Sequence, residues 1–154
     1  MSQDKHYILY PTLSDLFACN VYKHTEGDQT FIIPLWMEES VFDIVIQDHD
    51  KTKKSEMVVT CIPVCPVDVT IDEHHHIHKT VYWDLFKLWN EHESTPRTVD
   101  IDGTLFHINR DELFIKKEQT VVFKFKGIPI GNASDVFDVT KKSNVYIHIH
   151  LCIT

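Results

Sequence analysis

The sequence predicts an all-β protein made of two small β-sandwich subdomains in tandem, with one short helical turn in each. Most apolar residues alternate with polar ones, which is the period of a half-buried strand. Glycine, proline and charged residues separate the alternating runs, and only two segments have helical spacing. Pro63 and Pro66 mark the predicted boundary, so the subdomains comprise residues 1–66 and 67–154.

In the first half, Thr12 or Ser14 can cap a helical turn in which Leu13, Leu16 and Phe17 point inward. A hairpin is expected around Glu26-Gly27-Asp28, and the charged segment 48–55 is expected to be a loop. The strands predicted in this half cover residues 7–10, 19–24, 29–35, 41–46 and 57–64.

In the second half, residues 84–90 have the spacing of a short amphipathic helix. Strands are predicted over residues 67–72, 97–103, 105–108 and 113–115, with a turn at Gly103. The last third predicts two more strands joined by a structured loop. In the first of these, Val121, Phe123 and Phe125 share one face. In the final strand, one face is purely aliphatic and consists of Val145, Ile147, Ile149, Leu151 and Ile153.

Several short motifs occur in a characteristic order. Thr12-Leu13-Ser14-Asp15-Leu16-Phe17 comes first, Asp100-Ile101-Asp102-Gly103 follows, and Gly127-Ile128-Pro129 precedes Lys142-Ser143-Asn144-Val145-Tyr146-Ile147. This order resembles the C-terminal region of DnaJ-type (J-domain) proteins, most clearly over residues 70–154. The matching positions are Leu13, Asp15, Leu16, Asp102, Gly103, Gly127, Ile128 and Pro129. The family's Gly-Asp before the last strand is replaced by Ser143-Asn144, so the turn there is expected to differ.

The resemblance implies a non-enzymatic module that binds unfolded client proteins on apolar surface and forms homo-oligomers. The sequence contains no His-Pro-Asp tripeptide and no Cys-x-x-Cys-x-Gly-x-Gly repeat, so the J-domain and the zinc insert of the family are not expected. Divergent relatives of similar appearance occur in large DNA viruses. The alternative function is therefore structural: a minor capsid or assembly component that binds fixed neighbours.

A partner-binding patch is predicted at Leu35, Trp36, Met37 and Phe42. Tryptophan and methionine are enriched at the centres of interfaces, and the neighbouring acids would keep the patch soluble. The alternative is that Trp36 is a core residue at the end of a strand.

The histidines offer a third functional hypothesis. His76 and His78 form one His-x-His pair, and His148 and His150 form another. On a strand the two members of each pair point the same way, so neighbouring strands could bring four imidazoles to one metal ion. The alternative is a polar strand face without metal, which predicts that the protein has no cofactor.

Composition excludes several classes of function. The net charge of −8 argues against nucleic-acid partners. No apolar run is long enough to span a bilayer, and no signal peptide is evident, so a cytoplasmic protein, or a virion protein if viral, is expected. The four cysteines are expected to be reduced and mostly buried. No catalytic motif is present, which predicts that the protein is not an enzyme.

Overall fold

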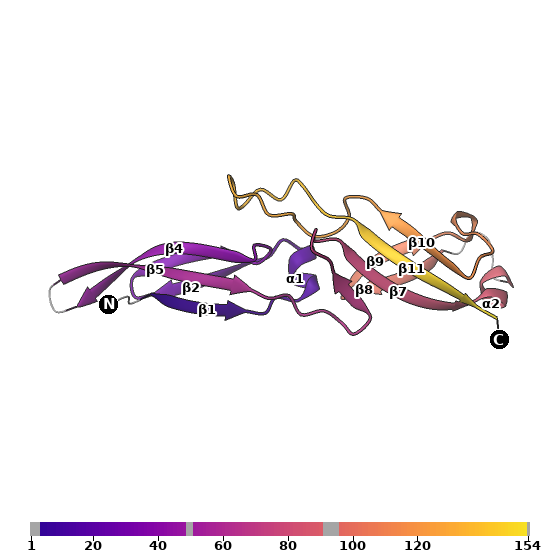
Figure 1. Cartoon of the computed structure of the whole chain (residues 1–154), viewed down its shortest axis with the longest axis horizontal. Helices are drawn as coiled ribbons and strands as arrows, with labels where there is room; N and C mark the ends of the chain where they lie inside the picture. The colour runs from indigo at the N-terminus through magenta and orange to yellow at the C-terminus, as the bar shows by residue number, and fades with distance from the viewer. Residues whose placement is uncertain (1–3, 49–50, 91–95, 154) are drawn as a thin grey trace.

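The computed structural model describes residues 4–48, 51–90 and 96–153. Strands account for 53% of the structure and helix for 10%, which confirms the predicted all-β class. The molecule is elongated, with the two halves of the chain arranged end to end (Figure 1). No helix among the described residues is both long and apolar enough to cross a membrane.

The first half is a three-stranded sheet packed against a hairpin. Its elements are β1 (Lys5–Leu9), α1 (Leu13–Phe17), β2 (Val21–Glu26), β3 (Gln29–Pro34), β4 (Glu39–Asp48) and β5 (Lys51–Cys61). The sheet has the order β1-β5-β4, in which β1 runs parallel and β4 antiparallel to β5, while β2 and β3 form the hairpin. Met57 and Val59 on the inner face of β5 are fully buried, as is Ile33 of the hairpin. The rings of Phe31 and Phe42 lie 5.3 Å apart between the two layers.

Helix α1 forms because Thr12 and Asp15 cap its N-terminus reciprocally. The Thr12 hydroxyl accepts a hydrogen bond from the Asp15 amide, and the Asp15 carboxylate accepts one from the Thr12 amide. This capping box satisfies two donors that a short helix would otherwise leave unpaired. Leu13 and Leu16 occupy the buried side of the helix, as the sequence predicted.

The second half is a four-stranded sheet packed against a second hairpin. Its elements are β6 (Val69–Ile71), β7 (Ile77–Asp84), α2 (Leu85–Asn90), β8 (Arg97–Ile101), β9 (Thr104–Ile108), a 3-10 turn (Arg110–Glu112), β10 (Glu118–Phe123) and β11 (Val145–Cys152). The sheet has the order β10-β11-β7-β6, and β8 pairs with β9. The predicted aliphatic face of the last strand is confirmed over Val145, Ile147, Ile149 and Leu151, which are buried, whereas Ile153 lies beyond the strand and is exposed.

The two halves repeat one arrangement. In each, a strand leads into a short helix, a hairpin and then two antiparallel strands, the last of which pairs in parallel with the first. Strand β6 is the addition that widens the second sheet. Among the described residues no sheet combines strands from both halves, yet the buried residues form one continuous core. The boundary at residues 66 and 67 stays a prediction.

Three local predictions are wrong. Of the segment 48–55, which was predicted to be a loop, the described residues 48 and 51–55 are strand, because β4 and β5 continue as a ribbon in which Asp48 pairs with Lys51; residues 49–50 lie outside the described residues. Phe125 does not extend the aromatic face of β10, since its backbone is left-handed (φ 61°) and its side chain is exposed. Residues 113–115 form no strand: Leu113 is buried after the 3-10 turn, and the next two side chains are exposed.

Candidate functional site

The two halves meet where α1 faces the turn of the β8–β9 hairpin. The Ser14 amide donates a 2.8 Å hydrogen bond to the Asp102 carboxylate, and the rings of Phe17 and Phe106 lie 6.1 Å apart. The segment between β10 and β11 extends back over the first half (Figure 1). There the indole Nε1 of Trp36 donates a 3.1 Å hydrogen bond to the Val136 carbonyl. The junction is therefore fixed by both polar and apolar contacts.

An open cavity of about 460 Å³ lies at this junction, which is within the usual range of ligand pockets. Buried apolar side chains from both halves line it: Leu16, Leu35, Trp36 and Cys61 from the first and Ile128 from the second. Polar residues that also line it are Glu38, Thr60, Asp72, Glu73 and His75. The cavity thus combines an apolar wall with three carboxylates.

Asp72 shapes the side of the cavity contributed by the second half. Its Oδ1 accepts hydrogen bonds from the amides of His74 and His76, and the His75 amide donates to its carbonyl. Partial burial disfavours the charged carboxylate, but the hydrogen bonds from His78 and from the two amides outweigh it and lower the pKa of Asp72 to about 2. Asp72 therefore keeps its charge at neutral pH and holds the 72–76 turn in place.

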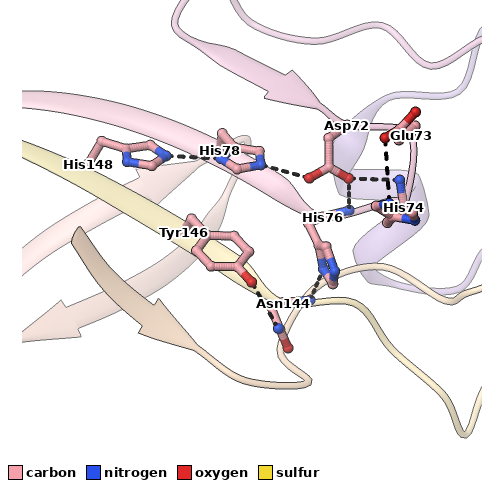
Figure 2. A network of polar contacts seen from close by, with 8 residues as sticks. All are labelled: Asp72, Glu73, His74, His76, His78, Asn144, Tyr146 and His148. Carbon is pink, nitrogen blue, oxygen red and sulfur yellow. Dashed lines mark hydrogen bonds and ion pairs between the residues drawn. The ribbon is translucent and has the colours of Figure 1, made fainter.

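Behind this turn, Asp72 ends a chain of side-chain hydrogen bonds across the outer face of the four-stranded sheet (Figure 2). His78 Nε2 lies 2.9 Å from Asp72 Oδ2, His78 Nδ1 lies 2.9 Å from His148 Nε2, and His148 Nδ1 lies 2.9 Å from the Thr120 hydroxyl. An ionised carboxylate only accepts, so His78 donates through Nε2. With both rings neutral, His148 then donates to His78, and Thr120 donates to His148.

The predicted pairing of histidines is realised only in part. Strands β7 and β11 are neighbours, and His78 and His148 meet. His76, however, accepts a hydrogen bond from the Asn144 amide, and the ring of His150 stacks on Tyr82 at 4.9 Å. The four imidazoles do not converge, and in the described part of the chain no group of three or more histidine, cysteine or acidic residues is placed to hold a metal ion.

The histidine chain predicts a pH dependence of stability. Partial burial, and then the charges of His78 and His150, lower the pKa of His148 below its ordinary value of 6.5. The unfolded chain therefore binds a proton that the folded protein resists, so the free energy of unfolding should fall as pH drops below about 6.5. We expect melting temperatures measured from pH 7.5 to 5.5 to fall less steeply in His148→Gln than in the parent protein. The exposed His107→Gln should keep the parental slope; equal slopes in both variants would contradict the assignment to His148.

The three-stranded sheet leaves a second feature, an apolar outer face. Its side chains, 43–62% exposed, are Ile8, Tyr10, Val41, Val45, Ile62 and Val64. They belong to one face because Ile8 pairs with Thr60, Val41 pairs with Val58, and Thr12 pairs with Val64 at the end of the ladder. Ile62 also lines the junction cavity, so the outer face leads directly into it.

The predicted partner-binding residues do not form an exposed patch. Leu35 and Trp36 are buried, the latter 7% exposed, and Met37 and Phe42 are half-buried. Trp36 is thus a core residue that lines the cavity, which was the alternative that the sequence left open. The sequence patterns did not lead us to predict the outer face, although Ile8 and Tyr10 alternate with the inward-facing Tyr7 and Leu9 and so indicate apolar residues on both faces.

Most of the family-like positions gather at the junction. Leu13 and Leu16 are buried in α1, Asp15 caps that helix, and Asp102 binds the Ser14 amide. Gly103 and Gly127 line a second hollow beside α1. Ile128 and Pro129 are both buried, and Ile128 also lines the junction cavity. Residues of these motifs therefore make contacts that join the two halves.

All four cysteines are free thiols; Cys61 is buried, Cys19 and Cys65 are half-buried, and Cys152 is exposed. Burial raises the pKa of Cys61 and of Cys65 above the ordinary value. Both thiols border the cavity and stay protonated at neutral pH, so they act as apolar wall there.

In comparisons with known proteins, no family model and no curated protein matches the chain.

Proposed function

We propose that this protein is a non-enzymatic binding module that holds apolar segments of other proteins, and that it is a divergent form of the DnaJ-type C-terminal region. The observation that carries the proposal is the apolar outer face of the β1-β5-β4 sheet. Soluble proteins rarely leave contiguous apolar surface exposed unless it binds something. Here Tyr10, Ile62 and Val64 lie together at the end of the sheet nearest the junction.

The geometry of this face suits an extended segment of a partner. Strand β1 is an edge of its sheet, so a partner strand can add to it while its alternate side chains contact the outer face. Asp43 and Glu56 pair with each other on the same face, further toward the tip of the β4–β5 ribbon, and Glu39 lies on it opposite Thr60, at the end nearer the junction. They limit the apolar area and would keep the free protein soluble.

The repeat of one arrangement in both halves supports the proposed kinship, as does the placement of the family-like motifs at the joint between them. The Gly127-Ile128 segment and Ser143 are hydrogen-bonded to each other although fifteen residues separate them. The motif at Gly127-Ile128-Pro129 and the motif that contains Ser143 therefore form one structural unit. We infer that the two motifs occur together in the sequence because each needs the other to form this contact.

The proposal is tested with a triple variant of the outer face, Ile8→Ser, Tyr10→Ser and Val64→Ser. Binding to a carboxymethylated, permanently unfolded model protein is measured by light scattering and by co-sedimentation. We expect the parent to suppress aggregation of the client and the triple variant to lose at least about tenfold in affinity, because exposed aromatic and aliphatic anchors supply most of the binding energy of such surfaces.

The matched control replaces Leu105, Phe137 and Ile153 by serine, three exposed apolar residues outside this face. The control should bind like the parent, and all three proteins should melt at similar temperatures. Unaltered client binding by the triple variant would overturn the proposal.

A further inference from the structure

We propose that the junction cavity selects the partner segment: it accepts a large apolar side chain whose neighbours in the partner are lysine or arginine. This inference rests on the proposed function, because the outer face leads into the cavity, but it adds a class of ligand that the apolar face alone does not specify.

The first step is the fit of an apolar anchor. The cavity is open to solvent and has a volume of about 460 Å³. Its wall is formed by side chains that are already buried in the core, including Leu35, Trp36 and Ile128. A wall of core residues is held in position by packing on its other side, so it does not need to rearrange when a ligand enters. An inserted apolar side chain would lose its hydration against this wall.

The second step is the charge at the cavity. Among the described residues that line it, Glu38, Asp72 and Glu73 are acidic, and none is lysine or arginine. The charge of Asp72 is fixed because the backbone amides of His74 and His76 and the ring of His78 already donate to its carboxylate. Glu38 and Glu73 line the cavity and are exposed to solvent, and Glu73 Oε1 lies 3.5 Å from His74 Nε2.

These two features lie within one cavity, so they recognise one ligand with two properties. A purely apolar segment would leave the three carboxylates without a counter-charge, and a purely basic one would leave the apolar wall unused. An acidic segment would be repelled. The net charge of −8 favours the approach of a basic segment over longer distances as well.

The test uses three fluorescein-labelled synthetic peptides and the whole chain, with binding measured by anisotropy. The peptides are Lys-Lys-Leu-Trp-Leu-Lys-Lys, its counterpart with glutamate in place of every lysine, and its counterpart with serine in place of the apolar residues. We expect the first to bind at least about tenfold more tightly than either of the others, with an affinity that falls as salt is raised.

The variant Glu38→Gln with Glu73→Gln should reduce the preference for the lysine peptide over the glutamate peptide by about tenfold. The control Glu112→Gln with Glu118→Gln removes the same net charge from exposed positions elsewhere and should keep the preference. Asp72 is left intact because it holds the 72–76 turn. A third variant, Cys65→Phe, adds volume to the cavity wall and should weaken binding of the lysine peptide, with the melting temperature measured to verify that it folds.

The outcomes separate this inference from the proposed function. Equal binding of the lysine and glutamate peptides, both lost in the outer-face triple variant, would overturn the charge selection and leave the proposed function in place. Binding of the lysine peptide that survives Cys65→Phe in a folded protein would overturn the cavity as its site. No binding of any apolar peptide would contradict both.

Discussion

Ile149→Asp should abolish the folded state. Ile149 is 0% exposed and lies on β11, the strand that pairs with β7 on one side and β10 on the other. Its backbone partners are Val81 and Gln119, so a carboxylate there has apolar core beneath it and no route to solvent along the sheet. An unpaired charge in a core costs several kcal/mol, and protonating it to avoid the charge still leaves an unsatisfied polar group. That loss is a large part of the roughly 5–15 kcal/mol by which domains are stable.

Urea titrations followed by circular dichroism provide the measurement. We expect a cooperative transition for the parent and none for Ile149→Asp at 25 °C. His150→Ser, the next residue on the same strand, is the control, because its side chain lies on the outer face against Tyr82. It should remain folded. Similar damage from both changes would mean that β11 does not bury alternate residues.

Gly127→Ala should have the second-largest effect, through a close approach of two backbone segments. A Cβ atom at this position would lie 2.2 Å from the Ser143 Oγ and 2.8 Å from the Ser143 carbonyl oxygen. The two segments are joined at that point: the Gly127 amide donates to the Ser143 carbonyl at 2.8 Å, and the Ser143 amide donates to the Ile128 carbonyl at 2.9 Å. Ser143 is fully buried, so it cannot swing into solvent to make room.

The expected cost is about 2–4 kcal/mol, the sum of overpacking and of weakened buried hydrogen bonds. Chemical denaturation should reveal it as a lower midpoint. Gly27→Ala is the control: Gly27 has a left-handed backbone (φ 56°), which Gly127 lacks, but a Cβ there would meet nothing within 4 Å. Gly27→Ala should therefore lower the free energy of unfolding only by the backbone strain of an alanine in this conformation, about 1 kcal/mol. A loss in Gly127→Ala no larger than that in Gly27→Ala would contradict the close contact with Ser143 as the cause of the effect at position 127.

Local sequence determined the elements whose causes are local. The capping residues Thr12 and Asp15 placed α1, and Glu26-Gly27-Asp28 placed the first hairpin. Strict alternation from Val145 onward predicted which side of β11 is buried. In each case the deciding contacts join residues only a few positions apart, or a strand period that any core would impose.

Tertiary structure decided the rest, because the deciding partners are far apart in the chain. The polar residues 48 and 51–55 form strand since backbone pairing between β4 and β5 needs no core beneath it. The junction contacts between Ser14 and Asp102 and between Trp36 and Val136 span 88 and 100 residues, and the His78–His148 contact spans 70. Sequence patterns show that such side chains exist but not which of them meet. The all-β class and the buried faces of the strands were therefore open to prediction from the sequence, whereas the junction cavity and its acidic, apolar character required the folded chain.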